Sequence, residues 1–162
     1  MRRWTLSKRD RRKLEEVLAR LYPQYTLPKN VIVEYAIIED AELVIIDKLP
    51  AFIKFGNNKY IPHLLYLLRR GYSWLPQVVV DKGAVGPISR GADLMRPGIV
   101  EIVGSFETDS IVVILEPSRK LPIAVHRTLY NSNTIIGMKK GRVTKRLHYI
   151  GDKYWKLADR LL

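Results

Sequence analysis

The sequence predicts an α+β protein of two domains, an N-terminal α/β domain over residues 1–75 and a strand-rich domain over residues 76–162. The chain of 162 residues is 47% hydrophobic, which is enough for one good core or two small ones. Near the start, apolar residues recur at helical spacing, and later they form short runs separated by turn residues. Trp74 and Leu75 lie at the junction, and Pro76 opens the second domain after a short linker.

The first domain is expected to begin with a helix near residues 7–22. Ser7 has the side chain of an N-cap, and Asp10 follows three residues later. The buried stripe of this helix is expected to consist of Leu14, Val17, Leu18 and Leu21. Its other face is strongly basic, and that pattern fits either a solvated surface or a contact with phosphates. The cations concerned are Lys8, Arg9, Arg11, Arg12, Lys13 and Arg20.

Three short strands should follow, over residues 31–38, 43–46 and 51–55. The connections between them are so short that an antiparallel meander is predicted. A second helix is expected to start at Pro62, which suits a first helical turn, and to end at Gly71.

The second domain is expected to open with a buried strand, Val78–Val80, which ends at Asp81. An Asp at that position can cap a helix, so residues 82–89 are predicted to be helical, with Gly91 as a left-handed C-terminal cap. A loop over residues 92–96 then leads to a turn at Pro97-Gly98 and a strand over residues 99–103.

The remaining elements of the second domain are two strands that form a hairpin, a short helix, a third strand and a final helical segment. In the third of these strands, alternation should place Val143 and Lys145 on one face and Arg142, Thr144 and Arg146 on the other. The expected ranges are 110–115, 121–127, 132–140, 142–147 and 154–157.

Several stretches of the second half resemble the signature of PUA domains, small RNA-binding β pseudobarrels. Taken together they are similar to the malignant-T-cell-amplified-sequence family, translation-associated proteins with an N-terminal domain ahead of a PUA domain. The resemblance also fits an archaeal type of member. It is specific over residues 78–156 and extends to the layout of residues 1–75. The matching stretches are Val80–Ala84, Gly91–Ile99, Asp109–Ile114 and His148–Asp152, followed by Trp155.

The resemblance implies a PUA-like pseudobarrel over residues 76–162 and a protein that binds structured RNA, tRNA-like or ribosomal, in translation or RNA modification. It also implies that the helix after the first strand and the following loop touch the RNA. Small residues leave the backbone open to phosphates there, and Arg side chains reinforce the contact. The implied residues are Lys82, Gly83, Ala84, Arg90, Gly91, Ala92, Asp93, Leu94, Met95, Arg96, Pro97 and Gly98. From charge alone we add Lys139, Lys140 and Arg142.

The net charge of +12 agrees with a polyanionic partner. The two halves on either side of Leu75 each carry 14 Lys and Arg against 8 Asp and Glu, or +6 each, so neither half is a basic tail on a neutral body. A heat-adapted surface also contains many charges, but ion-pair enrichment does not by itself leave such an excess of cations. A different class of function, a protein-interaction subunit of a translation-factor complex, remains open because eukaryotic members of the resembled family act with a partner protein.

Enzymatic and cofactor functions find no support in the sequence. The chain has no cysteine, and its three histidines lie far apart without a second ligand at metal spacing. The glycines at positions 83, 86 and 91 match neither the dinucleotide fingerprint nor the P-loop. We therefore expect a non-enzyme without cofactor or metal. No signal peptide or membrane-length apolar run is seen, so a cytoplasmic location is expected.

Three residues of the loop have two interpretations each. Leu94 and Met95 are expected to pack in the core, and the alternative is that they form a surface on which RNA bases stack. Asp93 suits a turn as well as a contact with RNA. His148 is expected to form a packed, hydrogen-bonded pair with Tyr149.

Overall fold

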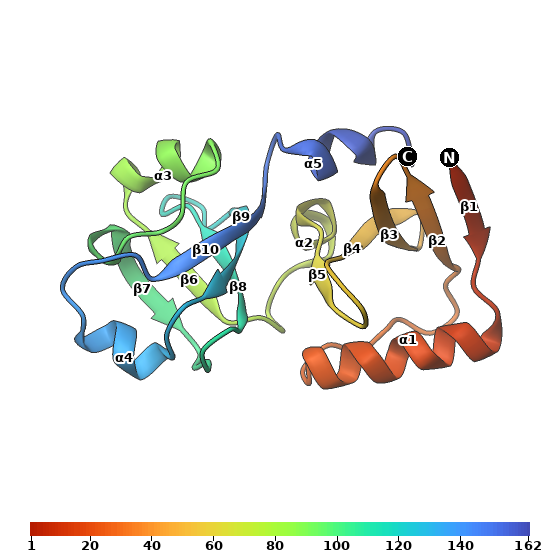
Figure 1. Cartoon of the computed structure of the whole chain (residues 1–162), viewed down its shortest axis with the longest axis horizontal. Coiled ribbons are helices and arrows are strands. Elements are labelled where there is room, and N and C mark those ends of the chain that lie inside the picture. Colours follow the sequence, from red (N-terminus) through yellow and green to blue (C-terminus); the bar gives the residue numbers. More distant parts are fainter. The chain divides into compact units, whose positions relative to one another are not determined.

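A computed structural model describes all 162 residues, and the chain forms two compact units (Figure 1). One unit contains residues 1–74 and 153–162, and the other contains residues 75–152. The last ten residues thus pack with the first unit, whereas the sequence predicts them to be part of the second domain. The reason lies in α5 (Lys153–Ala158): the Tyr154 carbonyl lies 3.0 Å from Nε2 of His63, and the rings of Tyr154 and Phe55 are 5.5 Å apart.

The first unit is built on a five-stranded antiparallel sheet in the order β1-β2-β3-β4-β5. The predicted meander is confirmed, but β1 and β5 add a strand at each end. The exposed, charged β1 has no apolar pattern, so only its pairing with β2 identifies it as a strand. The strands are β1 (Arg2–Thr5), β2 (Val33–Ile38), β3 (Ala41–Ile46), β4 (Leu49–Lys54) and β5 (Tyr60–Pro62).

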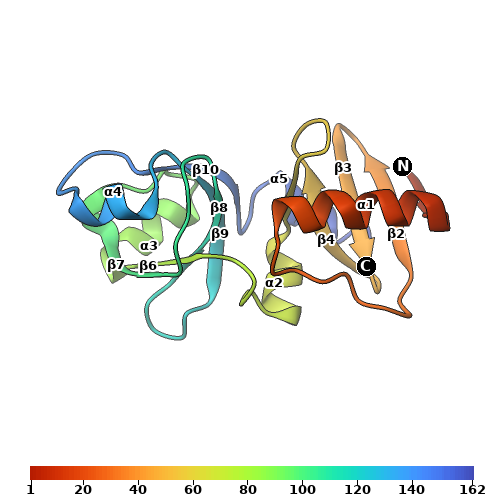
Figure 2. The same cartoon turned by 90° about the horizontal axis from the view of Figure 1, so that it is seen from below.

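Two helices begin at side-chain caps in this unit. Helix α1 (Lys8–Leu21) crosses one face of the sheet, and the Ser7 hydroxyl accepts a 3.1 Å hydrogen bond from the Asp10 backbone N–H (Figure 2). Helix α2 (Leu64–Arg70) starts two residues later than expected. Pro62 pairs with Phe52 in the sheet, and Nδ1 of His63 accepts from the N–H of Leu65 as the cap. Gly71 ends α2 with φ of +92°, as predicted.

The second unit contains a mixed five-stranded sheet in the order β10-β9-β8-β6-β7, in which only β6 and β8 run parallel. Its apolar core includes Val78, Ile88, Leu94, Val112 and Ile114. The strands are β6 (Gln77–Val80), β7 (Ile99–Val103), β8 (Ile111–Leu115), β9 (Pro122–Thr128) and β10 (Thr144–Tyr149). The helical segments are α3 (Lys82–Ser89), the 3₁₀ turn η1 (Arg96–Gly98) and α4 (Ser132–Gly137).

The strand β10 departs from the predicted alternation. Val143 and Thr144 are both buried, while Lys145 and Arg146 are both exposed. The strand pairs with β9 in regular register from Thr144 to Arg146, and a bulge between Arg146 and His148 shifts the register only beyond that point. The partner of His148 also differs from the expected one, because its Nδ1 lies 2.8 Å from the carboxylate of Asp152.

Candidate nucleic-acid interface

Helix α3 begins at an N-cap residue, Asp81, that directly follows β6. The carboxylate of Asp81 accepts a 2.8 Å hydrogen bond from the Ala84 N–H, as predicted from the sequence. The N–H of Asp81 donates to the carbonyl of Gly98 at 2.9 Å, so the start of the helix is tied to the end of the following loop. Lys82 and Gly83 are exposed on the first turn, and Ala84 is half-buried.

Gly91 ends this helix in a conformation and a space that only glycine fits. Its φ is +96°, in the region that L side chains rarely adopt. A Cβ at this position would lie 2.9 Å from Cε1 of Tyr149, so the aromatic ring packs directly on the backbone. The Arg146 guanidinium lies 5.4 Å from the centroid of the same ring. The helix end is therefore locked against β10.

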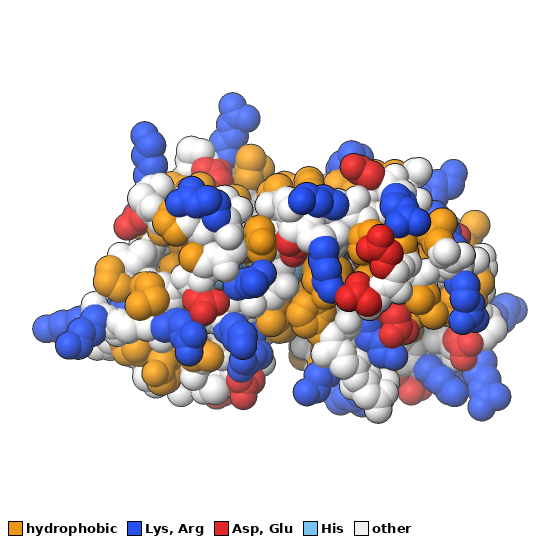
Figure 3. All heavy atoms as spheres, turned by 45° about the horizontal axis from the view of Figure 1, so that its top comes forward, with side chains coloured by type: hydrophobic (Ala, Val, Ile, Leu, Met, Phe, Trp, Pro, Cys, Tyr) orange, Lys and Arg blue, Asp and Glu red, His pale blue; other side chains and the backbone are white.

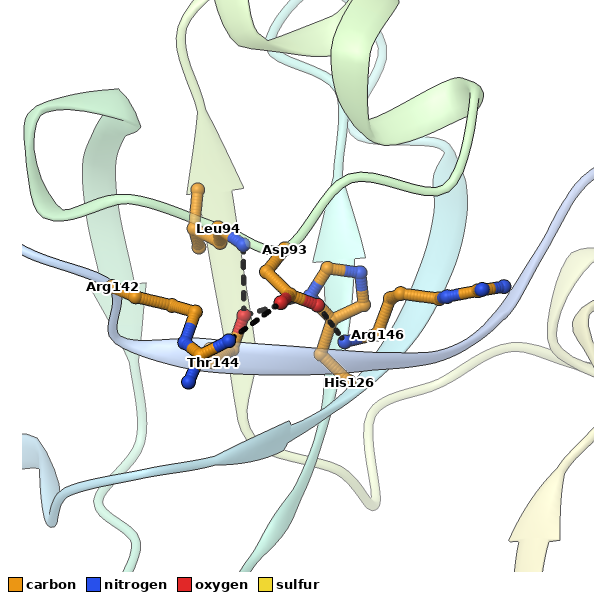
Figure 4. A network of polar contacts seen from close by, with 6 residues as sticks. All are labelled: Asp93, Leu94, His126, Arg142, Thr144 and Arg146. Atoms are coloured by element: carbon orange, nitrogen blue, oxygen red, sulfur yellow. Dashed lines mark hydrogen bonds and ion pairs between the residues drawn. The ribbon is translucent and has the colours of Figure 1, made fainter.

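The loop that follows is held to β10 by the side chain of Asp93, as Figure 4 shows. Oδ1 of Asp93 accepts a 2.8 Å hydrogen bond from the backbone N–H of Arg146, and Oδ2 lies 3.3 Å from the Arg142 guanidinium. The bond to the N–H is short and charge-assisted, whereas the exposed ion pair contributes little. Asp93 thus positions the loop, and its carboxylate is committed to protein groups.

Leu94 and Met95 have opposite environments. Leu94 is 1% exposed and fills the core, as expected. Its carbonyl accepts from the Val143 N–H at 2.9 Å, and its N–H donates to the Thr144 hydroxyl at 3.3 Å. Met95 is 50% exposed, so the prediction of a core plug is wrong for this residue. Met95 forms an isolated antiparallel β-bridge with Arg142, so the backbone is locally extended and successive side chains point to opposite sides.

The hydroxyl of Thr144 connects the loop to a buried histidine. Nδ1 of His126 lies 2.7 Å from this hydroxyl, while Nε2 of the same ring has no hydrogen-bond partner. Burial lowers the pKa of His126 to about 3, and the nearby carboxylate of Asp93 opposes that shift only in part. The ring is therefore neutral at physiological pH and serves as a packed support for the loop.

Arg96 is tied into the protein, although the sequence suggested a contact with RNA. Its Nε donates to the Ile135 carbonyl at 2.7 Å, and a longer contact of 3.5 Å reaches the Ile136 carbonyl. These carbonyls belong to α4, so the guanidinium satisfies acceptors near the end of that helix. The backbone N–H of Arg96 donates to Gly141 at 2.7 Å. Arg96 is thus a positioning residue between the loop and α4.

The remaining small residues of the loop keep its backbone close to α3. Ala92 and Gly98 are half-buried, and Pro97 is exposed. A Cβ on Gly98 would lie 3.2 Å from the Cβ of Ala84 and 3.3 Å from Cδ1 of Leu94, so this glycine permits tight packing of the loop on the helix.

Seven cations of this unit are exposed and take part in none of its ion pairs. They are Lys82, Arg90, Arg119, Lys139, Lys140, Lys145 and Arg146. Lys82 and Arg90 lie at the two ends of α3, whereas Lys139 and Lys140 follow α4. In the space-filling view, Lys and Arg side chains predominate over Asp and Glu around α3 (Figure 3).

Sequence reasoning missed three residues of this surface, which are Lys145, Arg146 and Tyr149. Two adjacent cations in a strand were a signal, but the expected alternation placed them on opposite faces. Both are exposed in the structure, and the packing of the Tyr149 ring on Gly91 depends on a glycine that is distant in the sequence.

The side chains of the whole chain include no group of three or more His, Asp or Glu residues arranged to hold a metal ion. No helix combines the length and apolar character that crossing a bilayer requires.

Comparisons with known proteins divide the chain in a similar way. Residues 76–150 match the PUA domain, and residues 2–70 match a domain of unknown function, DUF1947. An uncharacterized protein of Methanocaldococcus jannaschii is 36% identical over 159 residues, which cover 95% of each chain.

Eukaryotic relatives are more distant. Translation machinery-associated protein 20 of Eremothecium gossypii is 26% identical and covers 90% of this chain and 81% of its own. A malignant T-cell-amplified sequence 1 homolog of Drosophila melanogaster is 25% identical, covering 65% of this chain and 59% of its own. Among solved structures, a PUA-domain protein of Aeropyrum pernix K1, in complex with tartrate, matches with a TM-score of 0.91 at 28% identity. That match covers 99% of this chain and 92% of the other.

Proposed function

Because the chain belongs to the malignant-T-cell-amplified-sequence family of PUA-domain proteins, we propose that it is a non-enzymatic protein that binds structured RNA. The proposed RNA is a tRNA or a ribosomal RNA, and the proposed context is translation or RNA modification. The names of the relatives as translation machinery-associated proteins support that context.

One observation carries the proposal: unpaired cations flank a glycine-rich backbone that the rest of the unit holds rigid. Asp93, Leu94 and Arg96 fix the loop to β10 and α4 by hydrogen bonds of 2.7–3.3 Å. Lys82 and Arg90 remain exposed beside it. A rigid, open backbone with cations at its edges suits the phosphates and shallow minor groove of an A-form helix.

The proposal assigns different roles to the residues that the sequence suggested. Lys82, Arg90, Lys145 and Arg146 contact phosphates, and Gly83 and Ala92 allow the close approach. Lys139, Lys140, Arg142, Met95 and Pro97 form the outer edge of the same surface. Gly91, Asp93, Leu94, Arg96, Gly98 and Ala84 hold it in shape.

Binding to a purified tRNA and to a ribosomal hairpin tests this function. The logarithm of the binding constant should fall linearly with the logarithm of salt concentration between about 50 and 200 mM, because phosphate contacts release counterions. An unstructured oligonucleotide should bind more weakly through this surface. Absence of binding at low salt, or binding that is insensitive to salt, would contradict the proposal. Sequencing of RNA that is crosslinked to the protein in cells would then identify the RNA.

A further inference from the structure

The first unit contains a pocket of about 420 Å³ that the surface described above does not involve. Its volume lies in the roughly 300–1,000 Å³ range of small-ligand sites. Residues of α1 and of all five strands line it, so it lies where α1 crosses the sheet, a crossing that Figure 2 shows. Three aromatic residues, Trp4, Tyr35 and Tyr60, contribute to the lining.

The aromatic residues of this pocket are arranged as a platform. The rings of Trp4 and Tyr35 are 5.4 Å apart and tilted by 35°. The Arg2 guanidinium lies 5.2 Å from the Trp4 ring, and Trp4 itself is 37% exposed. A large aromatic side chain that remains this exposed on an edge strand offers area for a planar ligand.

Polar groups surround the platform. The Tyr35 hydroxyl donates a 2.8 Å hydrogen bond to the carboxylate of Glu42, and Nζ of Lys54 lies 4.0 Å from the same carboxylate. Lys13 of α1 lines the pocket as an exposed cation that forms no ion pair. Asp10 and Glu42 therefore offer acceptors inside the pocket, while Lys13, Lys54 and Arg2 surround them with positive charge.

We propose that this pocket binds a base of an unpaired RNA segment, with the flanking phosphates on Lys13 and Lys54. Proteins bind single strands by combining aromatic rings, on which bases stack, with cations that follow the backbone. The carboxylates favour bases that carry an exocyclic amino group, such as cytosine, because those bases donate hydrogen bonds. The same carboxylates oppose an acidic peptide, which is the other ligand that the outer cations would attract.

The test measures binding of an eight-nucleotide oligocytidylate to the full-length protein and to four variants. Trp4→Ala, and the pair Lys13→Ala with Lys54→Ala, should each weaken binding at least tenfold. Trp4→Phe keeps an aromatic ring and should stay within threefold of the parent. The matched control is Lys29→Ala with Lys156→Ala, which removes two exposed charges of the same unit outside the pocket. It should also stay within threefold.

The proposal fails if the two lysine pairs weaken binding equally, or if Trp4→Ala binds like the parent. Crosslinking of the unmodified protein to the oligocytidylate with ultraviolet light avoids any question of folding. Crosslinked peptides should contain Trp4, Tyr35 or Tyr60, and crosslinks confined to other peptides would overturn the assignment. Binding of oligoglutamate without binding of the oligonucleotide would overturn the proposal and point to a protein partner instead.

Binding of a structured RNA hairpin, measured in parallel, separates this inference from the proposed function. The pocket variants should leave hairpin binding within threefold of the parent. If the pocket variants lose oligocytidylate binding and keep hairpin binding, the protein has two separate RNA sites. If the unmodified protein binds the hairpin but not the oligocytidylate, only the pocket assignment is rejected.

Discussion

The carboxylate of Asp93 accepts a 2.8 Å hydrogen bond from the backbone N–H of Arg146, which lies 53 residues later in the chain. A negative charge thus occupies the middle of a surface that we assign to RNA. Its role is to hold the loop against β10, with Arg142 as a second partner at 3.3 Å.

This arrangement predicts that Asp93→Ala weakens RNA binding, although the change removes a negative charge. The loop would be in its binding-competent conformation only part of the time, and the apparent dissociation constant rises by the inverse of that fraction. We expect a loss of threefold or more, measured by titration with a tRNA. Faster hydrogen exchange at residues 92–96 should accompany the loss. Tighter binding by the variant would show that the carboxylate acts only through its charge.

The two arginines that flank the loop should separate into different roles. Arg96→Ala removes hydrogen bonds to carbonyls near the end of α4 and should lower the free energy of unfolding by about 1.5–3 kcal/mol. Arg90→Ala removes an exposed side chain and should change stability by no more than about 0.5 kcal/mol while it weakens RNA binding. Chemical denaturation and RNA titration of both variants check this. Equal stability of the two variants would contradict the assignment.

The short-range features of this region could be predicted from the sequence, and the long-range ones could not. The cap at Asp81 and the cap at Gly91 depend on residues within a few positions, so composition and spacing reveal them. The bond from Arg96 to Ile135 joins residues 39 positions apart, and nothing in the local pattern distinguishes it from an exposed arginine. The same reason explains why Met95 and Leu94 could not be told apart.

The first unit shows the same limit. The meander of β2, β3 and β4 follows from apolar runs and short turns, but β1 has four exposed residues and becomes a strand only by pairing with β2. The final helix α5 looked like the end of the second domain because it follows β10 directly in the chain. Its contacts with His63 and Phe55 are tertiary and leave no local signal.

Gly91→Ala should destabilise the protein more than Gly151→Ala. Both glycines have φ near +95°, so each substitution incurs a backbone cost of about 1–3 kcal/mol. Only at Gly91 would the new methyl group meet another side chain, the ring of Tyr149 at 2.9 Å, whereas nothing lies within 4 Å at Gly151. Overpacking adds about 1–3 kcal/mol. Thermal and urea unfolding of the pair measure the difference, and equal destabilisation would rule out a tight contact with Tyr149.

Stability should fall as the pH is lowered from about 6.5 toward 3, in part because of His126. Burial depresses the pKa of this ring to about 3 in the folded protein, so below the ordinary value near 6.5 the unfolded chain binds a proton that the folded chain does not. That difference lowers the free energy of unfolding by up to about 1.4 kcal/mol per pH unit. His126→Gln removes the titration, and its stability should depend less steeply on pH in this window. Parallel curves for parent and variant would contradict the assignment.

The proposed RNA surface is tested most directly by the salt dependence of tRNA binding in two triple variants of equal charge. One removes Lys82, Arg90 and Lys145 beside the loop, and the other removes Arg12, Lys29 and Lys156, which are exposed in the first unit. The first should lose at least tenfold in affinity, which is about 1.4 kcal/mol. Its log–log salt slope should flatten by up to about three units, roughly one for each lost phosphate contact. The second should bind within threefold of the parent with an unchanged slope. Equal losses in the two variants would show that overall charge, and not the surface formed by α3, its loop and β10, governs the binding of RNA.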